Sequence, residues 1–243
     1  MFYNVFIMLT YKDRAMKLIN RGLKNCVVSY SCGKDSALAL HRAIICGFMP
    51  KSLITTYNEE KDSSWFHSIP EPLLKQVGES LGIEMTLIKT KGDEYTSNFE
   101  LVLEKFKNEG VDVCIFGDID IEEHIDWCSE RCKNVGIEPF FPLLNEPRIS
   151  LVYEFINSGF RTHITTIDTS RMDGKLLGKA LTINLVEKLI VHGIDPCGES
   201  GEFHTFTSDG PIFKKPVLFR FGNMIYSENH VSVLLYSPLA SSK

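Results

Sequence analysis

Short apolar runs alternate with longer amphipathic stretches along the first half of the chain. Apolar runs rich in Val, Ile, Thr and Tyr are typical of buried strands, whereas apolar positions three and four apart are typical of helices. The pattern predicts strands at 25–31, 52–57, 84–89 and 111–116. It predicts helices that each end before a glycine, at 36–46, 72–81, 97–109 and 121–135.

The regular alternation of strand and helix predicts a parallel sheet, because a helical crossover returns the chain to the starting edge of the sheet. We therefore expect an α/β fold with a Rossmann-like sheet and helices on both of its faces. Ligands of such sheets bind outside the carboxyl ends of the strands. Two loops lie at such ends, namely 31–36 and Gly117-Asp118.

The pattern changes after three prolines, at positions 139, 142 and 147. We place a boundary near residue 142, between a nucleotide-binding domain at 1–142 and a smaller α+β domain at 143–243. The second part is predicted to contain a helix, a strand, a long helix, a loop and further strands, at 149–158, 161–167, 173–192, 195–206 and from 211 onward. The apolar start, 1–9, predicts a strand or a helix packed on the body.

Composition narrows the class of protein. A chain of 243 residues with 44% hydrophobic and 23% charged residues is typical of a globular protein. A net charge of −5 argues against a general nucleic-acid binder, which is usually basic, but allows a small anionic ligand in a local site. The seven cysteines form no paired framework, which indicates reduced thiols and a cytoplasmic protein. No apolar run approaches the ~18 residues of a membrane span.

The loop after the first strand has the residue types of a phosphate site; in order, it contains Ser31, Cys32, Gly33, Lys34, Asp35 and Ser36. A helix N-terminus offers unpaired N–H groups and a positive dipole end. Gly33 lets the backbone approach a ligand, Lys34 supplies a cation, and Ser31 and Ser36 supply hydroxyls. Asp35 suits a magnesium ion or a helix cap. The spacing matches neither a Walker A loop nor G-x-G-x-x-G, and the simplest alternative is a capped turn with an exposed lysine.

This segment resembles the PP-loop, S-G-G-K-D-S, of the ATP pyrophosphatases, which split ATP into AMP and pyrophosphate. The resemblance implies ATP and Mg²⁺ as cofactors, with the loop gripping the pyrophosphate end while the α-phosphate is attacked. Cys32 stands where the family has its first glycine. If that position needs a positive φ angle, Cys32 is strained there.

A second loop, from Cys197 to Phe206, holds two carboxylates, a histidine and a threonine. Composition alone favours a solvated turn. With the following Asp209-Gly-Pro-Ile-Phe213, however, it resembles the G-E-x-G-E-[FY]-x-T-F signature of the diphthine–ammonia ligase family. Three further segments resemble that family in the same order: Trp65 to Pro70, Gly117-Asp118-Ile119 and Leu177-Gly178-Lys179.

The resemblance implies an enzyme that activates a carboxylate as an acyl-adenylate, releases pyrophosphate and forms an amide with ammonia. Lys34 and Asp35, with Glu199 and Glu202, are then the candidate catalytic residues. Asp35 and Asp118 are candidate magnesium ligands, and Gly117 and Asp118 join residues 31–36 around the nucleotide. Glu199 and Glu202 could hold a cationic group or ammonium, or act as the base, and the sequence does not choose between these roles. The candidate substrate-binding residues are Gly198, Glu199, Gly201, Glu202, Thr205 and His67.

The implied small-molecule partners are ATP and ammonia. In the named activity the acid is diphthine, a modified histidine of elongation factor 2, if the source is archaeal or eukaryotic. A bacterial source would require an unknown carboxylate. Two other functions are open: a PP-loop enzyme that modifies tRNA, which predicts a basic face and paired catalytic cysteines, and a nucleotide sensor without turnover. We expect the active site between the two domains, with the second loop facing the PP-loop; a homo-oligomer is compatible with the sequence.

Overall fold

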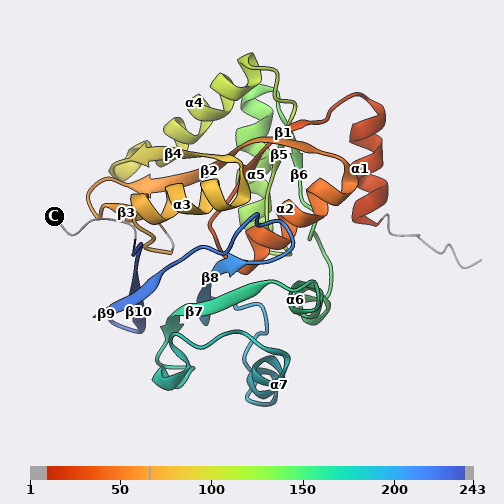
Figure 1. Ribbon diagram of the computed structural model, residues 1–243. Coiled ribbons are helices and arrows are strands. Elements are labelled where there is room, and N and C mark those ends of the chain that lie inside the picture. The colour runs from red at the N-terminus through yellow and green to blue at the C-terminus, as the bar shows by residue number, and fades with distance from the viewer. Residues whose placement is uncertain (1–9, 66, 239–243) are drawn as a thin grey trace, which may run out of the picture.

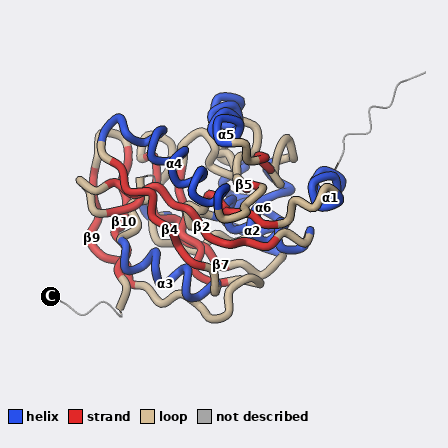
Figure 2. The backbone as a smooth tube through the Cα atoms, turned by 90° about the horizontal axis from the view of Figure 1, so that it is seen from above, coloured by secondary structure: helices blue, strands red, loops and turns tan. Residues whose placement is uncertain are grey.

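The computed structural model describes residues 10–65 and 67–238. The chain forms two sheets, the second of which lies against the helical layer beneath the first (Figure 1). The strand or helix predicted at 1–9 lies outside the described residues. Figure 2 shows the first described helix, α1 (Tyr11–Asn20), at one end of the molecule and strands β9 (Arg220–Tyr226) and β10 (His230–Tyr236) at the other.

The first sheet is parallel in its five main strands, as the alternating pattern predicts. In spatial order these are β4 (Glu84–Thr90), β2 (Met49–Asn58), β1 (Asn25–Ser29), β5 (Val113–Ile115) and β6 (Glu138–Phe140). A short strand, β3 (Ser63–Ser64), pairs antiparallel with the end of β2. The central strand β1 places the loop that follows it at the carboxyl edge of the sheet.

Helices cover both faces of this sheet, which confirms the expected architecture (Figure 1). On one side lie α2 (Lys34–Cys46) and α3 (Glu71–Leu81), and on the other α4 (Tyr95–Asn108) and α5 (Glu122–Val135). Successive strand residues point to opposite faces. Val27 therefore belongs to the buried cluster of Phe99 and Leu103 on α4, whereas Val28 belongs to that of Leu38 on α2.

Helix α1 was not predicted, although a local signal for it exists. Thr10 accepts a hydrogen bond from the backbone N–H of Asp13, and the Asp13 carboxylate accepts one from the backbone N–H of Thr10. This capping box fixes the start of the helix. Ala15 buries the inner face of α1 in the core, and α1 contacts α2.

The second sheet is antiparallel, in the order β8 (Phe203–Asp209), β7 (Arg161–Asp168), β10, β9. Helices α6 (Arg148–Asn157) and α7 (Ile183–Val191) accompany it. The predicted helix at 149–158 and the strand at 161–167 are confirmed. The tail predicted to form strands from 211 onward does so only from Arg220. The boundary near residue 142 stays a prediction: one continuous buried cluster contains residues of both sheets.

The single long helix predicted at 173–192 is wrong. A short 3-10 turn, η2 (Gly174–Leu176), is followed by extended backbone, and α7 begins only after Thr182, whose side chain caps it. Gly178 has a φ angle of +77°, which ends helical geometry there. The segment then bonds to β7, since the N–H of Gly178 donates to the carbonyl of Ile164.

The loop predicted at 195–206 is also shorter than expected, because β8 begins at Phe203. Phe203 and Phe206 are fully buried, while the polar residues between them pair with β7. This segment is too polar to be predicted as a strand from its composition. It nevertheless forms a strand because its backbone pairs with a neighbouring strand.

Candidate active site

The phosphate loop connects β1 to α2, and hydroxyl groups of its own serines bond to its backbone. The N–H of Gly33 donates to Ser31 Oγ (3.3 Å), and Ser36 Oγ donates to the carbonyl of Gly33 (3.0 Å). Helix α2 starts at Lys34, so its unpaired N–H groups face the carboxyl edge of the sheet. This is the arrangement that the sequence predicts for a phosphate site.

Cys32 has a φ angle of +66° and a fully buried side chain. The position therefore does need the left-handed conformation that glycine adopts without steric cost. The carbonyl of Cys32 accepts a hydrogen bond from the N–H of Thr207 (2.8 Å). Backbone pairing and burial together hold the strained residue in place.

Strand β8 of the second sheet docks directly on this loop. Besides the bond from Thr207, Thr205 Oγ1 accepts a hydrogen bond from the backbone N–H of Lys34 (3.1 Å). Thr205 thereby satisfies one of the unpaired N–H groups at the start of α2, although it lies 171 residues away in sequence. The second loop consequently faces the phosphate loop, as expected.

The Lys34 side chain points from the phosphate loop to the second loop, and only 4% of the residue is exposed. Its ammonium donates to Asp35 Oδ2 (2.7 Å) and to the carbonyl of Cys197. Burial alone would lower the pKa of Lys34, but the charge of Asp35, with a contribution from Glu199, raises it above the ordinary value. A permanent cation therefore stands between the two loops.

A cavity of about 280 Å³ lies between the phosphate loop and the second loop. Predicted residues that line it are Ser31, Gly33, Lys34, Asp35, His67, Gly198, Glu199, Gly201 and Thr205. Burial, and then the charge of Asp35, raise the pKa of Glu199 to about 8. Glu199 is therefore able to give or take a proton near neutral pH.

The second loop is shaped by Asp195. Its carboxylate accepts hydrogen bonds from the backbone N–H groups of Cys197 (3.0 Å) and Glu199 (2.9 Å). Arg148, the first residue of α6, donates to Asp195 (2.5 Å) and, through two nitrogens, to Asp120 in the segment between β5 and α5 (2.6 and 2.9 Å). Arg148 thus connects the loops at the carboxyl edge of the first sheet.

An aromatic cavity of about 370 Å³ adjoins this site, and sequence analysis missed it. Tyr95 and Phe99 of α4 and Trp127 of α5 line it, together with Phe116 at the end of β5. Tyr95 and Phe99 are four residues apart on one helix face, which is the only local signal for this wall. Its flat apolar lining suits a nucleobase.

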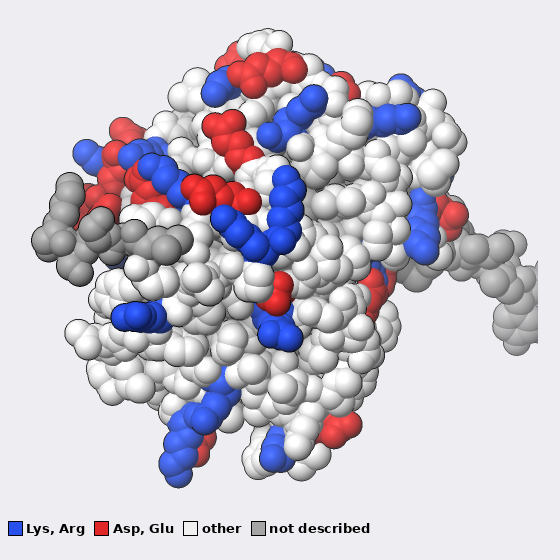
Figure 3. Space-filling view, viewed as in Figure 1, with Lys and Arg blue, Asp and Glu red and all other residues white. Residues whose placement is uncertain are grey.

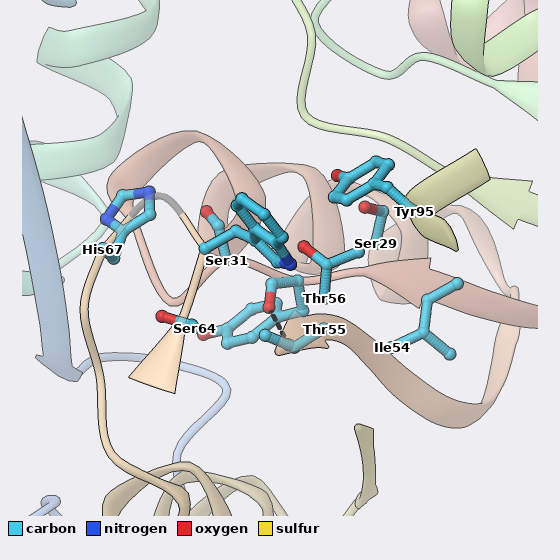
Figure 4. A pocket seen from close by; sticks show the side chains of 10 residues that line it. Ser29, Ser31, Ile54, Thr55, Thr56, Ser64, His67 and Tyr95 are labelled. Atoms are coloured by element: carbon cyan, nitrogen blue, oxygen red, sulfur yellow. Dashed lines mark hydrogen bonds between the residues drawn. The ribbon is translucent and has the colours of Figure 1, made fainter. Parts of the chain in front are cut away.

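A smaller cavity of about 70 Å³ lies where β1 and β2 end. Figure 4 shows the hydroxyl groups of Ser29, Ser31 and Thr56 between His67 on one side and Tyr95 on the other. His67 lines this cavity, the aromatic cavity and the cavity between the loops. The three cavities therefore meet at one imidazole ring.

Asp118, a predicted nucleotide or magnesium residue, lines the aromatic cavity. Its Oδ1 lies 3.8 Å from His124 Nδ1, and burial raises the pKa of its carboxyl. Gly117 packs against α2: a Cβ there would lie 2.9 Å from the backbone nitrogen of Ser36. Gly117 thus allows the segment after β5 to lie close to the phosphate loop and the start of α2.

Glu202 lies apart from the other predicted residues. It is 1% exposed, its Oε1 pairs with Arg171 Nη2 (2.7 Å), and its Oε2 accepts the N–H of Ser200 (3.0 Å). Glu202 lines none of the three cavities described above. In this geometry its carboxylate stabilises the second loop, and its predicted catalytic role has no geometric support.

A parallel sheet with a lysine-bearing loop between its first strand and helix defines a nucleotide-binding α/β protein. The family models of the diphthamide synthase N-terminal and C-terminal domains match residues 24–139 and 147–230. The chain belongs to the diphthine–ammonia ligase family, a family of ATP-dependent amide ligases.

Similar proteins agree with this assignment. A diphthine–ammonia ligase of Homo sapiens is 28% identical over 216 residues, which cover 77% of this chain and 80% of that protein. One of Mus musculus is 32% identical over 148 residues, covering 58% and 54%. A structure from Methanocaldococcus jannaschii, titled a predicted subunit of tRNA methyltransferase, covers 79% of this chain and 100% of its own at 16% identity and a TM-score of 0.42, too low to support a conclusion. In the described part of the chain, no helix has the length and apolar character needed to cross a membrane.

Proposed function

We propose that this protein adenylates a substrate carboxylate with ATP and then forms an amide with ammonia. Diphthine on elongation factor 2 is the proposed acid in an archaeal or eukaryotic source. The observation that supports this most directly is the cavity between the loops. There a buried lysine at a helix N-terminus faces Glu199, whose pKa is raised to about 8.

In the first step, a carboxylate oxygen of the substrate attacks the α-phosphorus of ATP. The bond from that phosphorus to the bridging oxygen breaks, and pyrophosphate leaves. Lys34 and the N–H groups at the start of α2 bind the negative charge that develops on the leaving group. The aromatic cavity of Tyr95, Phe99 and Trp127 holds the adenosine, so the α-phosphate lies near the junction of the cavities.

Magnesium is a proposed cofactor whose fit can be tested on the donor set. No group of three or more His, Cys, Asp or Glu side chains in the described chain could hold a metal by itself. Mg²⁺ often binds through one or two carboxylates together with substrate phosphates. Asp35 and Asp118 line neighbouring cavities and offer such oxygens, so they would hold a phosphate-bound Mg²⁺, which would neutralise phosphate charge.

In the second step, ammonia attacks the carbonyl carbon of the acyl-adenylate, and AMP leaves with the bonding electrons. The nitrogen must lose a proton, and Glu199 is the proposed acceptor. A carboxylate with an ordinary pKa is a weak base, whereas one raised to about 8 is matched to proton transfer near neutral pH. The donor is free ammonia.

The two other functions have less support. A tRNA-modifying enzyme predicts a basic face, but on the face in Figure 3 basic and acidic side chains are interspersed among the described residues. It also predicts paired reactive cysteines, yet Cys32 and Cys197 at this site are buried, which raises the pKa of both thiols. A sensor without turnover would bind ATP but form no AMP.

Product analysis with a lysine variant tests the proposal. Incubation with ATP, magnesium, ammonium and a nucleotide-depleted cell extract should yield AMP and pyrophosphate. Lys34→Ala should reduce AMP formation by at least ~10²-fold, because it removes the only side-chain cation that the structure places inside the phosphate loop. The exposed Lys215→Ala serves as the matched control and should leave the rate unchanged. Formation of ADP, or an active Lys34→Ala protein with a native circular dichroism spectrum, would contradict the proposal.

A further inference from the structure

His67 lies over the phosphate loop with one edge of its ring. A Cβ atom added to Gly33 would lie 3.0 Å from His67 Cε1 and 3.6 Å from His67 Nε2. His67 belongs to the segment between β3 and α3. Any phosphate bound on the loop at Gly33 therefore lies within reach of the Cε1–Nε2 edge of the imidazole.

The tautomer of His67 follows from its hydrogen bond. His67 Nδ1 lies 3.1 Å from the carbonyl oxygen of Thr205, and a carbonyl only accepts. Nδ1 therefore has the hydrogen, and in the neutral ring Nε2 holds a lone pair. Burial, and then His204, whose ring centroid is 5.1 Å away, lower the pKa of His67 to about 3. Without a ligand the ring is neutral at neutral pH.

Charged and titratable groups reach this region from α2, α5, β8 and the loops beside them. Lys34 and Asp35 come from α2, His204 from β8 and Glu199 from the loop before β8. Asp118, from the segment between β5 and α5, and His124, from the first turn of α5, share the aromatic cavity with His67. Lys34 disfavours a proton on His67 in the empty site. Bound phosphate would reverse this balance, because it adds several negative charges on the side of Nε2.

A lone pair on Nε2 is also the wrong partner for phosphate. Ionised phosphate oxygens have no hydrogen to donate, so they need a donor opposite them. One unit of negative charge at ~4 Å in a partly buried site shifts a pKa by roughly three units. Phosphate charge on the side of Nε2 therefore acts against the burial that holds the pKa of His67 low, and it favours the protonated ring.

We propose that His67 takes up a proton from solvent when nucleotide phosphates bind, and that its Nε2–H then donates to a phosphate oxygen. Lys34 and the imidazolium of His67 would thus hold the phosphates from two sides, one cation permanent and the other created by the ligand. The proposal depends on phosphate binding at the loop, which is one part of the proposed function, and not on amide formation.

Calorimetry measures the proton directly. Inorganic pyrophosphate is titrated into the full chain at neutral pH in two buffers of different ionisation enthalpy, and the difference in heat gives the protons taken up. Comparison with His67→Gln removes the contribution of the titrating ligand itself. Wild type should take up roughly one proton more than His67→Gln and bind at least ~10-fold more tightly, the strength of a charge-assisted hydrogen bond.

His204→Gln is the matched control, since it removes the neighbouring imidazole and should preserve the proton uptake. Equal uptake by wild type and His67→Gln would overturn the proposal. If His67→Gln does not fold, NMR of wild type decides the question: the Cε1–H signal of His67 should move to an imidazolium position when pyrophosphate is added. An unmoved signal at saturating pyrophosphate would also overturn it. AMP formation is measured separately, so amide ligation could fail while this result stands.

Discussion

At the scale of single residues, Cys32 makes two opposing contributions to the stability of the fold. Its left-handed backbone costs about 1–2 kcal/mol, while its fully buried thiol contributes to the core. Cys32→Gly removes both, whereas Cys32→Ala keeps the backbone cost and loses most of the contacts. We expect Cys32→Gly to be more stable than Cys32→Ala by about 1 kcal/mol in urea unfolding.

Cys26 provides the control for this comparison. It is equally buried but lies in β1, in extended backbone, where alanine is better than glycine. There the order of the two variants should reverse. If Cys32→Ala is instead more stable than Cys32→Gly, as expected at Cys26, backbone strain at Cys32 is not significant.

Glu199 should determine how amide formation depends on pH. Because burial and Asp35 raise its pKa to about 8, the carboxylate that accepts the proton becomes populated only as the pH rises toward 8. The rate at a fixed concentration of unprotonated ammonia should therefore rise from pH 6 to 9, and Glu199→Gln should lose this limb. Plotting against unprotonated ammonia removes the titration of the donor, and an unchanged limb in the variant would reject Glu199 as the base.

The same group makes a contribution to stability with a definite sign. Its folded pKa exceeds its unfolded value of about 4.5, so the folded state binds more protons between these two pH values. Stability must then fall as the pH rises through this interval. Glu199→Gln should flatten that part of the pH dependence of the melting temperature.

Individual roles in the site depend on partners that sequence does not reveal. The spacing in the second loop makes Glu199 and Glu202 equivalent candidates, but Arg171, 31 residues before Glu202, takes its carboxylate. Glu199 is left to face Lys34 and Asp35 instead. Which of two neighbouring glutamates enters a cavity is set by contacts between distant segments.

At the scale of the elements, the segment that follows β5 approaches the start of α2 closely at Gly117. A Cβ there would meet the backbone of Ser36 and Asp35 at 2.9–3.2 Å, and backbone atoms cannot move aside. Gly117→Ala should lower stability by about 1–3 kcal/mol and weaken ATP binding. Gly174→Ala is the control, because open space surrounds that glycine, and it should change neither the unfolding midpoint nor ATP affinity.

The helices and strands can be predicted from the sequence more readily than the cavities that lie between them. All four helices and four strands predicted for the first half are confirmed, because each strand is a short apolar run and each helix has its own period and a glycine directly after its predicted last residue. The aromatic cavity was missed because Phe99 and Trp127 have the spacing of ordinary core residues. A gap between two helices is a property of their packing. The segment 173–192 was misassigned because its residues 178–181 bond to β7, a contact that the local pattern does not reveal.

Across the two sheets, Arg148 is the main ionic connection at the site. Its side chain is 29% exposed and joins Asp120 to Asp195, which in turn holds the backbone of Cys197 and Glu199. Arg148→Gln should therefore increase hydrogen exchange at those two amides by about tenfold, without changing β1. Arg21→Gln, which removes an exposed ion pair with Glu138, should leave the loop unchanged. Uniform acceleration in the Arg148 variant would indicate general destabilisation instead.

The bond from Lys34 to the carbonyl of Cys197 couples the phosphate loop to the second loop. The ammonium has three donors, and Asp35 and the carbonyl of Cys197 accept from two of them. One donor therefore remains for a phosphate oxygen while the other two still hold the second loop against the phosphate loop. A shift of the ammonium toward a bound phosphate would also pull on the backbone two residues before Glu199, so the two loops respond to the ligand together.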